Sequence, residues 1–437
     1  MNEWTHSRLS RRRFLQAAGL TALLTGCGTG IAGRDPREIV FWHLLGGGDG
    51  ERMAEILSGI DDSWDAARIK PVVLAWGPPY YTKLSMSAAG GRAPDLAIMH
   101  MSRLAGFAPG GLLDPWDPAR LARYGITEQS FTASAWQSSI VNGKVYAIAL
   151  DSHAFVSFYN ATLAKKAGVL DSQGKLPEIK SLDDLKQLGR EFKRVTGKPY
   201  GIAYGYLGDG AQLWRLFWTF YTMHGATFDL QGDRFQYDAD AFGDSIETMR
   251  KLVDGEVASR SADGGTANSS FINGESGFIF SGVWDSPQFQ KADFELGAMP
   301  IPNLFGTGIK AAWGDSHTFV LPHQSQPDEA KRELAYEAVS RILKASLPWG
   351  GAGHTPAYLP VVNSPEFKAL RPNSDYAETA AYLKYDPPSS FTGGGSNFQN
   401  QFGSSFQNVM LGQTSVKDAI ADFAERVNVL MSKAVQR

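Results

Sequence analysis

The alternation of apolar and polar positions predicts strands and helices that follow one another along the chain. Residues 38–45 and 70–76 are short, apolar and rich in β-branched side chains, which is typical of buried strands. Residues 49–60 and 81–89 instead repeat their apolar positions at helical spacing. Strands that alternate with helices are typical of βαβ units, so the pattern predicts a mostly parallel sheet.

The same kind of pattern extends to the C-terminus. Apolar runs predict further strands at 95–99, within 144–160, at 278–283 and at 317–321. Amphipathic spacing predicts helices at 182–195, 211–225, 327–343 and 416–430. There is no internal repeat. The pattern therefore favours the α/β class.

Composition and charge narrow the class of protein. The chain has 437 residues, 43% of them hydrophobic, which favours a soluble protein of two or three domains. The 42 basic and 45 acidic residues give a net charge of -3 with no dense basic stripe, so we expect no nucleic-acid partner. The eight histidines show no H-x-x-x-H spacing, and there is a single cysteine. We therefore expect neither a metal site nor a cofactor.

Residues 1–26 do not look like part of the fold. Arg11, Arg12 and Arg13 precede a short apolar run that is too short to span a bilayer, and Leu24-Thr25-Gly26-Cys27 follows. This segment resembles a twin-arginine export signal joined to a lipoprotein box. The resemblance implies cleavage before Cys27 and acylation of its thiol, with residues 27–36 as a flexible tether. A buried core thiol is the alternative for Cys27.

Four later segments, in this order, resemble the family 1 extracellular solute-binding proteins of ABC importers, the group that includes maltose-binding protein. The four segments are Tyr81-Thr82-Lys83-Leu84 with Gly91-Arg92-Ala93-Pro94-Asp95-Leu96, the run from Val141 to Asn160, Phe271-Ile272-Asn273-Gly274-Glu275-Ser276-Gly277-Phe278 with Gly282-Val283-Trp284, and Gly412-Gln413-Thr414-Ser415. Together they cover most of the chain beyond the tether.

The resemblance implies a two-lobed, type II periplasmic-binding-protein fold with a ligand cleft between discontinuous lobes. Lobe 1 is expected to comprise residues 37–150 plus 315–366, and lobe 2 residues 151–314 plus 367–437. The chain would cross between them near 149–154, 312–317 and 362–372.

The same resemblance implies a function. The protein would capture a carbohydrate, either an oligosaccharide or an amino sugar, and deliver it to the permease of an ABC importer. The lipid on Cys27 would hold it at the outer face of the cytoplasmic membrane. We expect a monomer without enzymatic activity.

Aromatic side chains are the first candidates for a carbohydrate site, because sugars present flat C–H faces to them. Trp284 matches the tryptophan of the family's G-x-W motif, which stacks on the ligand in sugar binders; a core aromatic at a strand end is the alternative. Trp42 precedes a glycine run, and Trp313 lies at the second predicted crossing. Trp214 lies in a helix so rich in aromatics that it could equally fill core.

Polar candidates would bind the sugar hydroxyls. Asp49 lies in the run 46–50, where maltose-type binders place a hydroxyl-binding acid, although it could equally cap a helix. Asp151 and His153 interrupt an apolar stretch at the first crossing, and His153 falls where maltose-type binders carry an acid. The remaining candidates follow predicted strands or glycine-rich loops and are His100, Ser102, Asp315, His354 and Asn397.

A secreted glycosidase remains an alternative. Asp151 and Glu275 could then act as acid and base across a glycosidic bond. A glycosidase needs two carboxyl groups at a defined separation, whereas a binding protein distributes its acids among sugar hydroxyls. Release of reducing ends from disaccharides would distinguish the two.

Overall fold

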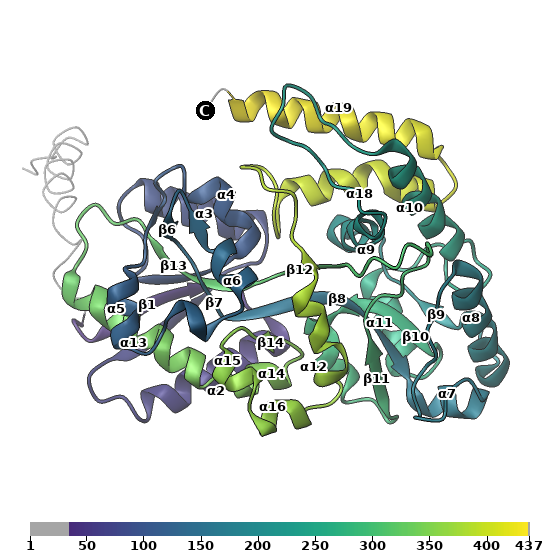
Figure 1. Ribbon diagram of the computed structural model, residues 1–437, viewed down its shortest axis with the longest axis horizontal. Coiled ribbons are helices and arrows are strands. Elements are labelled where there is room, and N and C mark those ends of the chain that lie inside the picture. The colour runs from purple at the N-terminus through teal and green to yellow at the C-terminus, as the bar shows by residue number, and fades with distance from the viewer. Residues whose placement is uncertain (1–34, 436–437) are drawn as a thin grey trace, which may run out of the picture.

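The computed structural model describes residues 35–435, and the chain in this range folds into two lobes that lie side by side (Figure 1). Each lobe contains a β-sheet with helices on its outer surfaces. The predicted export signal, Cys27 and most of the tether lie outside the described residues. Within them, no helix is both long enough and apolar enough to cross a membrane.

The sheet of the first lobe combines early strands with one that comes late in the sequence. Its strands, in spatial order, are β2 (Arg68–Val73), β1 (Glu38–His43), β3 (Leu96–His100), β13 (His317–Pro322) and β4 (Leu113–Asp114), with β7 (Ile148–Ala149) also paired to β13. The β1 strand pairs in parallel with β2 and β3, as βαβ units require. The late strand β13 runs antiparallel to β3.

The sheet of the second lobe is organised around one long strand, β8 (Asp151–Asn160). The other strands are β15 (Leu383–Lys384), β12 (Ala312–Asp315), β10 (Phe278–Gly282), β9 (Ile202–Ala203), β11 (Leu296–Met299) and β14 (Thr355–Pro356). Antiparallel pairing to β8 fixes β10, β11, β12 and β14. A small hairpin, β5 (Ile140–Val141) and β6 (Lys144–Val145), stands apart.

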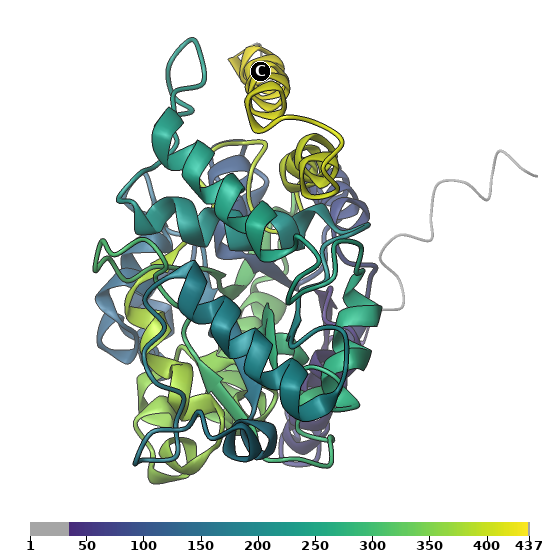
Figure 2. The same ribbon diagram turned by 90° about the vertical axis from the view of Figure 1, so that its right-hand side faces the viewer.

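Helices connect and cover these strands (Figure 2). The α-helices are α2 (Gly47–Asp61), α3 (Pro78–Ala89), α4 (Leu104–Phe107), α5 (Pro118–Arg123), α6 (Ala133–Ser138), α7 (Ala161–Ala167), α8 (Leu182–Thr196), α9 (Gly210–Met223), α10 (Ala239–Leu252), α11 (Gly264–Ile272), α12 (Ser286–Phe289), α13 (Glu329–Lys344), α14 (Leu347–Gly351), α15 (Leu359–Val362), α16 (Pro365–Ala369), α17 (Asn373–Tyr376), α18 (Asn397–Met410) and α19 (Val416–Val435). Short 3-10 turns are η1 (Met101–Arg103), η2 (Glu128–Ser130), η3 (Val283–Asp285) and η4 (Ala377–Ala381).

Each lobe has its own hydrophobic core. The first core draws on residues 39–150 and 319–358, and the second on 155–313 and 398–431. Helix α9 lies inside the second core, where every residue except Gln212 is buried. A helix that is largely apolar on all sides is stable when the core surrounds it.

The chain passes between the lobes where β8 begins and again where β12 leads into β13 (Figure 1). Gly314 and Asp315 pair with Ala154 and His153 of β8 at this point. A third passage lies between Tyr358, which packs in the first core, and Tyr376, which packs beside β8 of the second lobe. Residues on these passages lie at the base of the cavity between the lobes.

Candidate ligand cleft

A cavity of about 1050 Å³ lies between the two lobes. The first lobe lines it with the segment after β1, the start of α2, the segment after β2 and His100. The second lobe contributes Asp209, Arg215 and most of the residues from Trp284 to Lys291. His153, Trp313 and His317, which lie on the passages between the lobes, line it as well. A concave site at a domain interface, of this size, is typical of small-molecule binding.

Two tryptophans form an aromatic corner in this cavity. The rings of Trp284 and Trp313 are almost perpendicular, with centroids 6.2 Å apart. The Arg215 guanidinium lies 4.6 Å from the Trp284 ring and 4.9 Å from the Trp313 ring, within the range of cation–π attraction. Gly282 makes this corner possible, because a Cβ there would lie 2.0 Å from the Trp284 ring.

A buried carboxylate holds Trp313 in place. Asp386 accepts hydrogen bonds from Nε1 of Trp313 at 2.7 Å, from Nε1 of Trp214 at 2.8 Å and from Nε2 of Gln399 at 2.9 Å. Burial raises the pKa of the Asp386 carboxyl, although these hydrogen bonds oppose that shift. The indole of Trp313 therefore has a fixed orientation before any ligand arrives.

Acidic side chains reach the cavity from both lobes. Asp49 lies in the first turn of α2 and Asp209 caps α9, accepting from the Ala211 amide at 2.9 Å. Asp285 follows Trp284 directly and accepts from Gln288 Nε2 at 2.6 Å and from the Ser281 hydroxyl. Burial raises the pKa of Asp285. Such carboxylates can accept hydrogen bonds from hydroxyl or amino groups of a ligand.

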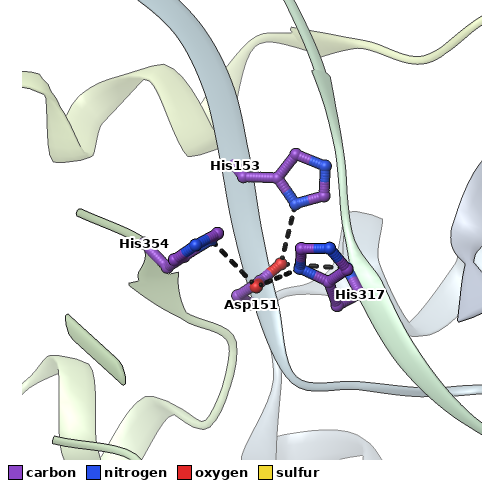
Figure 3. A group of neighbouring side chains, drawn as sticks. All are labelled: Asp151, His153, His317 and His354. Carbon is purple, nitrogen blue, oxygen red and sulfur yellow. Dashed lines mark hydrogen bonds and ion pairs between the residues drawn. The ribbon is translucent and has the colours of Figure 1, made fainter. Parts of the chain in front are cut away.

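Three histidines surround the buried carboxylate of Asp151 beneath this cavity (Figure 3). Nδ1 of His153 lies 3.1 Å from Asp151 Oδ1, and Nδ1 of His317 lies 2.8 Å from Oδ2. Nδ1 of His354 lies 3.1 Å from Oδ2 but is too poorly aligned for a hydrogen bond. The Trp349 indole donates to Oδ2 at 2.7 Å. We call Asp151, His153, His317 and His354 the hinge cluster.

The charges in the hinge cluster depend strongly on one another. Burial would raise the pKa of Asp151, but the neighbouring imidazoles hold it well below its usual range. Burial would lower the pKa of His354, but the carboxylates of Asp49, 3.0 Å from its Nε2, and Asp151 raise it to about 10. Burial and the nearby His317 lower the pKa of His153 to about 4. A cationic His354 thus lies between two carboxylates.

A third buried carboxylate, Asp315, joins the two lobes beside the hinge cluster. The Ser102 hydroxyl donates to it, as do the Ser102 amide at 3.1 Å and the Ser316 amide at 2.8 Å. Burial raises the pKa of Asp315 to about 7, against these hydrogen bonds. Gly394 packs so closely here that a Cβ would lie 2.9 Å from the His100 ring.

The structure brings most of the sequence-predicted residues to the cleft or directly beneath it. Those that line the cavity are Asp49, His100, His153, Trp284 and Trp313. Those buried beneath it are Asp151, Asp315 and His354. Ser102 lines a separate cavity of about 1140 Å³, on which Pro109, Trp218 and Tyr385 also lie.

Three further predicted residues lie away from the cleft. Trp42 is on the opposite face of β1 from Phe41 and lines a shallow hollow beside Pro79 and Lys83, because successive strand residues point to opposite faces. Trp214 is fully buried and stacks on Trp218 in the second core. Asn397 is exposed at the start of α18 and lines none of these cavities.

Several residues that line the cleft were not predicted. Trp76 is 47% exposed and follows β2 at its carboxyl end, a position that could have indicated a ligand contact. Arg215 is a charged residue within an otherwise apolar helix, which is also a usable signal. Asp285 adjoins the G-x-W motif. Asp386, which supports Trp313 from outside the cleft cavity, was not predicted either, and nothing in the local sequence distinguishes it.

Two lobes joined by crossing strands around a cleft define the class of proteins that bind a ligand by hinged closure. The chain belongs to the bacterial extracellular solute-binding protein family, whose model matches residues 69–337. The family and the two-lobed α/β fold predicted from the sequence are therefore confirmed.

Characterised relatives include an arabinooligosaccharide-binding protein of Bacillus subtilis, 26% identical over 381 residues that cover 82% of each chain. The maltodextrin-binding protein MdxE of the same organism is 23% identical over 58% of this chain and 59% of its own. The GacH receptor of Streptomyces glaucescens, solved unliganded and with acarbose, has a TM-score of 0.75 at 18% identity, covering 90% of this chain and 98% of its own. UgpB of Mycobacterium tuberculosis, solved with glycerophosphocholine, has a TM-score of 0.75 at 16% identity, covering 92% and 100%.

Proposed function

We propose that this protein is a lipid-anchored receptor that captures a carbohydrate between its lobes and delivers it to an ABC import permease. The half-buried Trp284 indole, which lines the cleft against the buried Trp313, is the observation that carries the proposal, because an accessible indole face suits the C–H faces of sugar rings. Sugar binding by the relatives supports the same ligand class.

The polar lining suits an oligosaccharide or an amino sugar. Asp49, Asp209 and Asp285 offer acceptors to hydroxyl groups from both lobes, and each can pair with an amine. Binding would shift the lobes towards a closed state, because only that state lets one ligand contact both sides of the cleft.

A ligand panel tests this proposal directly. Oligosaccharides, amino sugars and glycerol phosphodiesters are screened by thermal shift, and hits are measured by titration calorimetry. We expect a saccharide to raise the melting temperature. Stabilisation by glycerol phosphodiesters alone would contradict the carbohydrate assignment.

The Trp284→Ala variant tests the aromatic corner. Losing one stacking face should weaken affinity for the saccharide by roughly thirtyfold, or about 2 kcal/mol. The matched control is Trp42→Ala, which removes an indole outside the cleft. Equal affinities of the two variants would contradict the proposed contact.

The glycosidase alternative receives no support from its two proposed carboxylates. Asp151 is fully buried in the hinge cluster, whereas Glu275 is partly exposed and pairs with Lys198 at 2.8 Å. Neither lines the cleft cavity. We expect no release of reducing ends from any saccharide that the protein binds.

The anchor is tested by Cys27→Ser. The variant should lose incorporation of labelled fatty acid and leave the membrane fraction for the soluble one. Retention of the label would contradict acylation at Cys27.

A further inference from the structure

The hinge cluster unites ligand-type side chains from three separate segments of the chain. Asp151 and His153 begin β8, His317 begins β13, and His354 precedes β14 (Figure 3). The first two segments are passages between the lobes, and the third leads into the last passage. All four side chains are buried, with Asp151 and His354 fully so.

The four side chains have the composition and spacing of a metal site. Each offers one nitrogen or oxygen atom, and these atoms all lie within 4.8 Å of one another. Three imidazoles and one carboxylate suit Zn²⁺ and related divalent ions, with bonds of about 2.1 Å. A tetrahedral ion spaces its ligand atoms roughly 3.4 Å apart, so side-chain shifts of about 1 Å would close the site.

Neighbouring groups already orient two of these ligands. Asp49 lies 3.0 Å from Nε2 of His354, which leaves Nδ1 facing the cluster. The Trp349 indole hydrogen bonds to Asp151 and stacks on the His354 ring with a centroid distance of 4.4 Å. Carboxylate–histidine and donor–carboxylate contacts of this kind are the usual outer support of metal ligands.

One atom in the cluster lacks a hydrogen-bonding partner. Nδ1 of His354 is buried and aimed at Asp151, yet it forms no hydrogen bond. The other two imidazoles make hydrogen bonds to the carboxylate through Nδ1. In its ion pair with Asp151 this nitrogen is poorly aligned, which is costly on a fully buried side chain. A coordinated cation would replace the proton that Asp49 and Asp151 hold on His354 and would bind Nδ1 in its place.

We propose that the hinge cluster binds one divalent transition-metal ion of the zinc class. The ion would connect the first two passages between the lobes and the segment that leads into the third. His153 and His317 also line the cleft, which gives the ion a path from solvent. The local sequence gives no hint of the site, because its ligands come from segments far apart in the chain.

Metal binding is measured on the exported protein after removal of metal with a chelator. Zn²⁺ is titrated in competition with a chromophoric chelator, and Co²⁺ is titrated by visible absorption. We expect one ion per chain and the intense absorption of tetrahedral Co²⁺. His317→Gln and His354→Gln should each weaken Zn²⁺ binding at least a hundredfold.

The matched control is His323→Gln, which alters a partly exposed histidine paired with Asp114 at 2.8 Å in the first lobe. Its Zn²⁺ affinity should equal that of the parent. Absence of stoichiometric binding by the parent overturns the proposal even if the cluster variants misfold. Equal binding by folded cluster variants does so too. Neither readout requires a sugar, so failure here is separate from failure of the carbohydrate proposal.

Discussion

A single buried residue, Asp386, fixes the orientation of Trp313, a tryptophan that borders the cleft. Its carboxylate receives hydrogen bonds from the indoles of Trp313 and Trp214, of which only Trp313 lines the cavity. The core tryptophan and the cleft tryptophan therefore share one acceptor. Orientation of the cleft indole depends on the packing of the second core.

Replacing Asp386 by alanine should destabilise the protein. The change leaves the buried indole donors and the Gln399 amide without an acceptor, so we expect the free energy of unfolding to fall by about 2 kcal/mol or more. Urea unfolding monitored by fluorescence measures this. Asp293→Ala, at an exposed position, is the control and should stay within about 0.5 kcal/mol of the parent. Equal losses in both variants would contradict the anchoring role.

The sequence could reveal cleft residues only where a local motif marks them. Trp284 was identifiable from the G-x-W pattern. Trp214 and Trp313 are both buried, and only the tertiary fold places Trp313 against the cavity while Trp214 packs in the second core. The anchoring of Trp313 by Asp386 connects residues 73 positions apart, which no local pattern can show.

Among the elements, the turn between α14 and β14 has the tightest backbone contact near the site. Gly353 has a φ of 102°, and a Cβ there would lie 2.0 Å from the carbonyl oxygen of Val283. The turn carries His354 into the hinge cluster. Glycine at position 353 therefore avoids a clash with the Val283 carbonyl and also lets the turn position His354 in the hinge cluster.

Alanine at two nearby glycines should have opposite effects. Gly353→Ala introduces both a strained φ and a clash, so we expect a loss of more than about 2 kcal/mol in the free energy of unfolding. Gly351→Ala adds a methyl group at a helical position with nothing within 4 Å and should raise stability by about 0.5–1 kcal/mol. Chemical denaturation of both variants measures the difference. If both substitutions changed the free energy of unfolding in the same direction, this account would be wrong.

Elements with strong local signals were predicted closely. The Ser181 hydroxyl accepts from the Asp184 amide at 3.1 Å and begins α8, which ends at Thr196 before a left-handed glycine. The predicted strand 70–76 is instead β2, Arg68–Val73, because pairing with β1 sets its limits. Tertiary pairing likewise divides 144–160 into three strands, which periodicity alone could not foresee.

At the scale of the whole molecule, the two lobes approach each other closely where α2 faces α12. A Cβ on Gly48 of α2 would lie 3.4 Å from the ring of Pro287 in α12. That distance is ordinary van der Waals contact, so alanine would fit, whereas a bulky side chain would meet Pro287 and push the lobes apart. A small residue at position 48 therefore suits the separation seen in the structure.

Gly48→Trp should hold the cleft partly open. We expect saccharide affinity to fall at least about tenfold, or 1.4 kcal/mol, because fewer contacts reach both lobes. Small-angle scattering should show a larger radius of gyration with ligand than for the parent. Gly59→Trp, on an exposed part of the same helix, is the control. Unchanged affinity for Gly48→Trp would mean that closure at this point is not required.

The position of β13 has a consequence for biosynthesis. This strand lies between β3 and β4 in the first sheet, although the ribosome makes it only after most of the second lobe. Until β13 is made, one edge of β3 in the nascent first lobe has no partner strand. That edge can pair with another chain and aggregate, or it can be bound by chaperones. A fragment translated from a messenger truncated before His317 should therefore be insoluble, and adding a sugar ligand should not make it soluble.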